Sequence, residues 1–187
     1  MKKIQLKSRK NLFAHFVGVD EFNFHLTEQK CDVTRYVVSR PEAAAILLYN
    51  RDSNAFVFIR QFRTPVFTKG EDGFIIEIPA GVLEPGEEPL TTIVRETLEE
   101  TGYSISKPEL LYTFYPSPGI LNEKMHLYYA EVKNADKIEK GGGLETEKEF
   151  LEVIEIPVDQ ALQMVNNGRI IDAKTMLAVL KFHQSKT

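Results

Sequence analysis

The stretch GVLEPGEEPLTTIVRETLEETGY, from Gly81 to Tyr103, decides the fold and carries most of the chemistry. Pro89 suits the first turn of a helix, and Gly102 suits a left-handed cap at a helix end. The sequence therefore predicts a helix over Leu90 to Thr101. At about 3.6 residues per turn, one side of this helix is expected to pack into the core. That expected core side consists of Leu90, Ile93, Val94, Thr97 and Leu98.

Three glutamates are expected on the opposite side of this helix. Glu96 and Glu100 stand one turn apart, close enough to share a cation, and Glu99 lies beside them. Because like charges repel at this spacing, we expect Arg95 to pair with Glu99, with Glu87 approaching from the preceding loop. For the three carboxylates alone, a solvated acidic helix face is the simpler interpretation.

The spacing of the stretch favours a functional interpretation. It matches the pattern G-x5-E-x7-R-E-U-x-E-E-x-G-U, where U is a bulky aliphatic residue, through Gly81, Glu87, Arg95, Glu96, Glu99, Glu100 and Gly102. A seven-position match by chance has a probability on the order of one in a million. The chain therefore resembles the Nudix hydrolase family, which implies an α+β fold with a mixed β-sheet sandwiched between helices.

Two positions depart from this pattern, because Thr97 and Tyr103 fill the aliphatic slots. We expect the Thr97 hydroxyl to bond back to the carbonyl of Ile93, so that the departure affects packing rather than chemistry.

The resemblance also implies a metal site, since carboxylates of this helix bind divalent cations that bridge a diphosphate. Glu96 and Glu100 would be the principal ligands, with Glu99 and the backbone carbonyl of Ala80 as further ones. Hard oxygen donors without paired Cys or His favour Mg²⁺, with Mn²⁺ as the alternative, over zinc. The other matched residues would support the site structurally: Gly81, Glu87, Arg95 and Gly102.

Two flanking segments resemble the branch of this family that cleaves ADP-ribose and other nucleoside diphosphate sugars. In Ser117-Pro118-Gly119, the proline lies 16 residues beyond Gly102. Upstream, Arg63 ends an apolar strand pattern, where the branch sends an arginine to the substrate phosphates. The resemblance implies that both segments bind substrate. Taken alone, an ordinary turn and a surface arginine remain the alternatives.

An acidic segment, Glu145-Thr146-Glu147-Lys148-Glu149, follows the glycine run Gly141 to Gly143. In the branch, a mobile loop at this place supplies a glutamate as general base. The resemblance implies Glu147 as the first candidate and Glu149 as the second, and loop closure would exclude water when substrate is present. A solvated acidic loop is the alternative. The glycine run together with Gly168 to Thr175 most resembles the GDP-mannose pyrophosphatases within the branch.

The pattern changes at Arg40-Pro41, which predicts a boundary between a β-strand subdomain over 1–40 and a main domain over 41–187. The resemblance implies that the first serves dimerisation and that the second is the Nudix domain. Alternation from Phe22 to Leu26 and the run Val33 to Val38 predict a small antiparallel sheet. Because about 40 residues rarely hold a core alone, these strands must pack on the main domain or on a second subunit, so we expect a homodimer. The resemblance further implies that the strands exchange between subunits.

Further along the chain the apolar patterns predict strands and two closing helices. The predicted strands are Ala44 to Tyr49, Phe56 to Phe62, Gly73 to Ile78, Glu109 to Tyr115, Met125 to Val132 and Phe150 to Glu155, and the helices are Val158 to Asn166 and Asp172 to Gln184.

The composition is that of a globular protein, with 187 residues, 43% hydrophobic and 27% charged, and a net charge of −4. No apolar stretch approaches the about 18 residues of a membrane helix, so we expect no membrane association. The acidic balance and the lack of a basic run disfavour nucleic acid as a partner. A lone cysteine, Cys31, and a start without an apolar signal core predict a cytoplasmic protein.

The resemblance implies an enzyme that hydrolyses the diphosphate of a nucleoside diphosphate sugar with Mg²⁺. The expected products are a nucleoside monophosphate and a sugar phosphate, and the expected substrate is GDP-mannose or ADP-ribose. Two alternatives stay open. One is a sensor that binds ADP-ribose without hydrolysing it, and the other is a hydrolase of RNA ends or dinucleoside polyphosphates.

Overall fold

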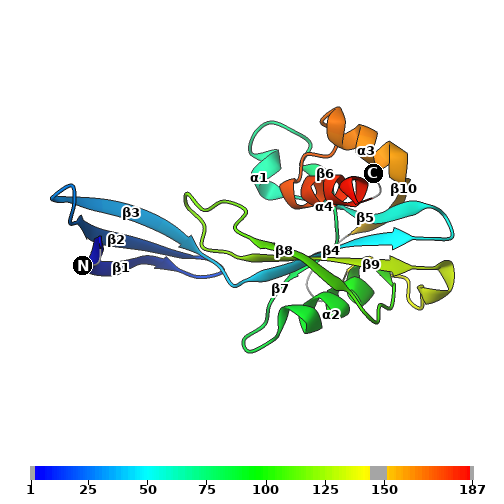
Figure 1. Ribbon diagram of the computed structural model, residues 1–187, viewed down its shortest axis with the longest axis horizontal. Coiled ribbons are helices and arrows are strands. Elements are labelled where there is room, and N and C mark those ends of the chain that lie inside the picture. Colours follow the sequence, from blue (N-terminus) through cyan, green and yellow to red (C-terminus); the bar gives the residue numbers. More distant parts are fainter. Residues whose placement is uncertain (1–2, 144–150, 186–187) are drawn as a thin grey trace. The chain divides into compact units, whose positions relative to one another are not determined.

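The computed structural model describes residues 3–143 and 151–185. The chain divides into two compact units (Figure 1). The first comprises Met1–Glu42 and Phe114–Lys124, and the second comprises Ala43–Thr113 and Met125–Thr187.

The first unit is built on an antiparallel sheet of three strands in the order β1-β2-β3. Its strands are β1 (Ile4–Ala14), β2 (Gly18–Leu26) and β3 (Cys31–Ser39). The two predicted strands, β2 and β3, are present, and the rings of Phe22 and Phe24 stack at 5.9 Å. Strand β1, which the sequence patterns did not predict, is exposed along its whole length.

The second part of this unit attaches to β3 through backbone hydrogen bonds. Val38 donates its N–H to the carbonyl of Ile120 at 2.8 Å, and Asn122 donates to the carbonyl of Val38 at 3.2 Å. The segment that contains Ser117, Pro118 and Gly119 therefore belongs to the same unit as the N-terminal sheet.

The second unit contains a seven-stranded mixed sheet in the order β10-β5-β4-β9-β8, with β6 paired to β5 and β7 paired to β4. Its strands are β4 (Ala43–Asn50), β5 (Ala55–Phe62), β6 (Phe74–Glu77), β7 (Ala80–Val82), β8 (Glu109–Phe114), β9 (Met125–Val132) and β10 (Glu152–Pro157). β4 runs parallel to β9 and antiparallel to β5 and β7.

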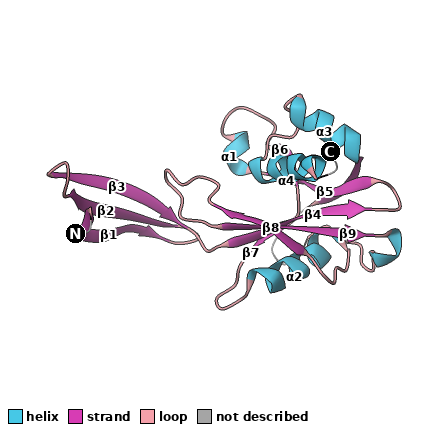
Figure 2. Ribbon diagram, viewed as in Figure 1, coloured by secondary structure: helices cyan, strands magenta, loops and turns pink. Residues whose placement is uncertain are grey.

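Helices cover both faces of this sheet, with α2 on one face and α3 and α4 on the other (Figures 1 and 2). The helices are α1 (Thr64–Phe67), α2 (Pro89–Thr101), α3 (Val158–Asn166) and α4 (Ala173–Gln184), with a short 3-10 helix at Asn134–Asp136. A mixed sheet sandwiched between helices confirms the predicted α+β fold.

Each face of the sheet has its own apolar core. Under α2, the side chain of Ile93 packs in a cluster with Ile46 and Val57, all fully buried. On the other face, the ring of Phe182 from α4 meets the ring of Phe56 edge-on at 4.9 Å. These two contacts hold α2 and α4 against opposite sides of the same strands.

The core side of α2 differs from the predicted one. Leu90 and Val94 are 49% and 37% exposed, whereas Glu100, expected on the opposite side, is only 3% exposed. The reason is helix geometry. At about 100° per residue, a residue seven positions after Ile93 returns to within about 20° of it, so Glu100 lies on the core side with Thr97.

Candidate active site

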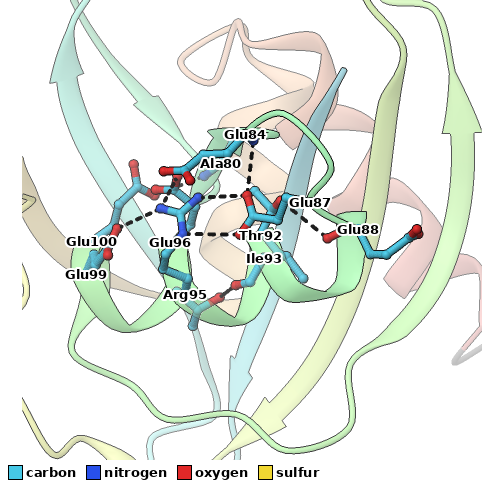
Figure 3. Close-up of polar contacts among 11 residues, drawn as sticks. Ala80, Glu84, Glu87, Glu88, Thr92, Ile93, Arg95, Glu96, Glu99 and Glu100 are labelled. Carbon is cyan, nitrogen blue, oxygen red and sulfur yellow. Dashed lines mark hydrogen bonds and ion pairs between the residues drawn. The ribbon is translucent and has the colours of Figure 1, made fainter. Parts of the chain in front are cut away.

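The guanidinium of Arg95 on α2 lies among three half-buried carboxylates (Figure 3). Its Nη1 contacts Glu96 Oε1 at 2.9 Å and Glu99 Oε2 at 3.1 Å. Its Nη2 and Nε contact the two oxygens of Glu87 at 3.2 and 3.4 Å. The expected pairing of Arg95 with Glu99 and the expected approach of Glu87 are both confirmed, and Glu96 contacts the same guanidinium.

These contacts shift the pKa values of Glu87 and Arg95. The hydrogen bond from Arg95, followed by the backbone N–H of Glu84, lowers the pKa of Glu87 to about 2. For Arg95, partial burial works against the charged form, but the bonds to Glu87 and Glu96 outweigh it and raise its pKa above the ordinary value. Glu87 and Arg95 therefore stay charged at neutral pH, and one guanidinium restrains three carboxylates.

Glu100 and Glu96 both lie against strand β7. The Oε2 of Glu100 accepts the backbone N–H of Ala80 at 2.9 Å. At the next residue, Gly81, an added Cβ would overlap the side chain of Glu96, so only a glycine leaves room for this carboxylate. Helix α2 and β7 thus bring the two predicted principal ligands to the backbone of Ala80 and Gly81.

The donor set fits a hard divalent cation, because it consists of carboxylate oxygens around a backbone segment without Cys or His. Within residues 3–143 and 151–185, no three ligands already stand in metal-coordinating geometry. Glu96 and Glu99 instead contact Arg95, so a cation would have to take over contacts that the guanidinium makes in this structure.

The C-terminal end of α2 is fixed by glycines. Gly102 has a left-handed φ of 78°, and its N–H bonds the carbonyl of Leu98 at 2.9 Å, as predicted for a cap. Gly142 and Gly143 donate their N–H groups to the carbonyls of Glu100 and Glu99, at 2.8 and 3.2 Å. The glycine run therefore docks on the end of the helix that carries the carboxylates.

Thr97 is fully buried, and its hydroxyl donates to the carbonyl of Ile93 at 2.6 Å, as the sequence predicted. The second departure from the family pattern, Tyr103, is buried as well. Its hydroxyl donates to Glu155 Oε1 at 2.7 Å and accepts a hydrogen bond from Asn50 at 3.2 Å. Both polar groups thus have partners inside the fold, away from the carboxylate cluster.

Arg63 lies directly after β5 and forms an ion pair with Glu77 on β6 at 2.7 Å. Glu77 is buried and also accepts a hydrogen bond from Lys174 at 2.8 Å. The sequence pointed to Arg63, but it did not point to Glu77 or Lys174. A charged residue within the apolar run Phe74 to Ile78 was the one available signal for Glu77.

The other substrate-binding candidates lie in the first unit. The carbonyl of Ser117 accepts the N–H groups of Ile120 and Leu121 at 3.2 and 2.9 Å, which makes a turn. Pro118 and Gly119 line a cavity of about 500 Å³. The other lining residues are Arg35, Tyr36, Val37, Tyr115, Ile120, Leu121 and Asn122.

The general-base candidates Glu147 and Glu149 lie outside the described residues. Their role stays a prediction from the resemblance. In the described part of the chain, no helix is long and apolar enough to cross a membrane.

Comparison with known proteins identifies similar chains. A family model described as NUDIX domain matches residues 39–178. A GDP-mannose pyrophosphatase of Cronobacter sakazakii is 39% identical over 178 residues, which cover 93% of this chain and 92% of the relative. The enzyme of the same name from Citrobacter koseri is 38% identical over 188 residues, 98% and 97% of the two chains. That from Salmonella arizonae is 36% identical over 188 residues, again 98% and 97%.

Proposed function

The chain belongs to the NUDIX family, and from this membership we propose that it hydrolyses the diphosphate bond of a nucleoside diphosphate sugar. The products are a nucleoside monophosphate and a sugar phosphate. GDP-mannose is the leading substrate, because the similar proteins are named GDP-mannose pyrophosphatases, and ADP-ribose is the second. The observation that carries the proposal is the convergence of Glu96 and Glu100 on the backbone of Ala80 and Gly81.

Glu96 and Glu100 would hold a divalent cation, with Glu99 and the carbonyl of Ala80 as further ligands. The all-oxygen donor set favours Mg²⁺, with Mn²⁺ as the alternative. When bound, such a cation supplies charge neutralisation on the diphosphate and activation of the attacking water. Arg95 restrains the same carboxylates when no cation is bound, which reduces their mutual repulsion.

The reaction breaks one P–O bond of the diphosphate bridge and forms one P–O bond to water. Arg63 would bind the phosphates, since a guanidinium matches phosphate oxygens in geometry and charge. Ser117, Pro118 and Gly119 would contact another part of the substrate. Glu147, or else Glu149, would accept the proton that the attacking water loses, and the bridging oxygen would leave with the departing phosphate.

A homodimer is part of the same proposal. The three-stranded sheet carries exposed apolar side chains, including Leu6 and Phe13 on β1, at 57% and 53%. A small sheet with exposed apolar side chains is marginally stable on its own, and a second copy would cover these side chains. Sedimentation should therefore give the mass of two chains, and a mass of one chain would contradict the dimer. The exposed lone Cys31 suits a reducing cytoplasm.

Turnover of a substrate panel tests the proposed activity. The panel contains GDP-mannose, ADP-ribose, other nucleotide sugars, dinucleoside polyphosphates and capped RNA, each with and without Mg²⁺. Cleavage of one or two nucleotide sugars only with Mg²⁺ is the expected result. If no substrate of the panel is cleaved and ADP-ribose binds tightly, the protein is a sensor. If only capped RNA or dinucleoside polyphosphates are cleaved, it is a hydrolase of those substrates.

A further inference from the structure

The backbone of Arg63 is fixed on both sides, although the residue lies in a connection between β5 and α1. Its N–H donates to the carbonyl of Gly73 at 2.7 Å. Its own carbonyl accepts the N–H groups of Val66 and Phe67 at 3.0 and 3.1 Å. The start of the Arg63 side chain is therefore held in one place, and only the direction of the guanidinium is left to be set.

Glu77 sets that direction. The Nε and Nη2 of Arg63 both reach the same oxygen, Oε2 of Glu77, at 2.7 Å. This pair takes one edge of the planar guanidinium and leaves out the third nitrogen, Nη1. A guanidinium held by one edge presents the opposite edge in a defined direction.

The other oxygen of Glu77 is bound from the protein interior. Its Oε1 accepts a hydrogen bond from Lys174 Nζ at 2.8 Å, and Lys174 also contacts Asp172 Oδ2 at 3.0 Å. Side-chain exposure rises from Glu77 at 5%, through Lys174 at 11%, to Arg63 at 38%. Arg63 is thus the outer end of a charged network whose inner end is buried.

We propose that Glu77 is a positioning residue that holds Arg63 with its Nη1 edge turned to the diphosphate of the nucleotide sugar. This inference rests on the proposed function, in which Arg63 binds the substrate phosphates. Glu77 itself contacts neither substrate nor metal, and it acts through the arginine.

Two opposite effects of Glu77 on phosphate binding can be distinguished. The carboxylate reduces the positive charge of Arg63, which would weaken attraction to a diphosphate. It also removes the rotamer freedom that a long side chain would otherwise lose on binding substrate. Lys174 supplies a second cation to the same carboxylate, so the neutralisation is shared and the orienting effect is expected to dominate.

Steady-state kinetics with GDP-mannose tests the inference. Glu77→Gln should raise KM about tenfold, since it replaces a charge-assisted hydrogen bond with a neutral one. The value of kcat should stay within about twofold, because the phosphate contact is made in both the ground state and the transition state. Glu77→Asp keeps the charge on a shorter side chain and should give a KM between those of the wild type and Glu77→Gln.

Two further variants separate positioning from a structural role. Arg63→Ala should raise KM at least as much as Glu77→Gln, and the double variant should match Arg63→Ala alone. Lys174→Met is the matched control, because it removes a contact to the same carboxylate without touching Arg63. It should lower the melting temperature and raise KM by less than about threefold, because Arg63 then neutralises Glu77 alone but stays oriented by it.

The inference is overturned if KM stays constant or falls in Glu77→Gln, or if the effects of Glu77→Gln and Arg63→Ala simply multiply. Should Glu77→Gln fail to fold, a KM equal to wild type in Glu77→Asp overturns it equally. Failure of the proposed function is distinct, because the wild type would then cleave no nucleotide sugar. If the wild type cleaves GDP-mannose and only Arg63→Ala raises KM, the function stands and the role of Glu77 is refuted.

Discussion

The close approach of Gly81 to Glu96 gives the sharpest structural prediction. The backbone of Gly81 is fixed because β7 pairs with β4, where Gly81 stands opposite the fully buried Ala44. In Gly81→Ala, the new Cβ would overlap the Glu96 side chain. Nonbonded carbon atoms stay about 3.5 to 4.0 Å apart, so the carboxylate of Glu96 would have to move by more than about 1 Å.

This displacement should affect catalysis much more than folding. The overlapped group is the end of a flexible side chain, so we expect the free energy of unfolding to change by less than about 1.5 kcal/mol. A misplacement of about 1 Å in a catalytic group can cost about 100-fold in rate, and kcat should fall by that order. The Mg²⁺ concentration that gives half-maximal activity should rise as well, because Glu96 would be moved away from the cation.

The assay is turnover of GDP-mannose over a Mg²⁺ titration, with urea unfolding of the same samples. Glu96→Gln provides the matched background, since Gly81→Ala should add little to a variant that already lacks this carboxylate. Wild-type turnover in Gly81→Ala would refute the role given to Glu96. If Gly81→Ala lowers kcat by the same factor in the wild type and in Glu96→Gln, Gly81 does not act through Glu96.

Three more substitutions test the residues around this helix. Glu100→Gln should lower kcat by at least about 100-fold with an unchanged circular dichroism spectrum, because a neutral amide is a poor ligand for a hard cation. Thr97→Val should keep kcat within about twofold and stabilise the protein by up to about 1 kcal/mol in urea unfolding, since it removes a hydroxyl that bonds back to the helix. Tyr103→Phe should cost about 1 kcal/mol at pH 8, because Glu155 loses a hydrogen-bond donor.

The effect of Tyr103 should depend on pH in a defined direction. Burial, followed by the hydrogen bond to Glu155, raises the pKa of Tyr103 to about 12. The folded protein therefore holds this proton more tightly than the unfolded chain, whose tyrosine pKa is about 10. The stabilisation is complete below pH of about 10 and is lost as the pH rises towards 12. Urea unfolding across this range should show the loss in the wild type and not in Tyr103→Phe.

Each of these predictions would be contradicted by a different result. Wild-type turnover in Glu100→Gln would remove its assignment as a metal ligand. A strong loss of stability in Thr97→Val would mean that the buried hydroxyl is required. A spectroscopic titration that gives Tyr103 a pKa near 10 would show that its buried environment is not as described.

Local patterns predicted most elements of the fold. The structure has β9 at Met125–Val132 and α3 at Val158–Asn166, with the predicted bounds, because apolar periodicity is strong in both segments. Strand β1, Ile4–Ala14, was not predicted, since its side chains are exposed and its sequence has no buried face. Backbone pairing with β2 holds it in place, and that pairing leaves no pattern in the sequence. The short β7 likewise depends on its pairing with β4.

The candidate site was predictable where its contacts are local. The pairing of Arg95 with Glu99 follows from spacing along one helix. The burial of Glu100 follows from the same helical geometry once the angle to Ile93 is worked out. The network of Glu77 was not predictable, because its partners lie 14 and 97 residues away in the chain and meet only when β6 and α4 are packed together.

Product analysis tests metal-dependent cleavage of a nucleotide sugar most directly. The wild-type protein is incubated with GDP-mannose in EDTA and in excess Mg²⁺, and the products are separated by ion-exchange chromatography. Equal amounts of GMP and mannose 1-phosphate, formed only with Mg²⁺, are the predicted result. Intact GDP-mannose in the presence of Mg²⁺, or equal cleavage in EDTA, would contradict it.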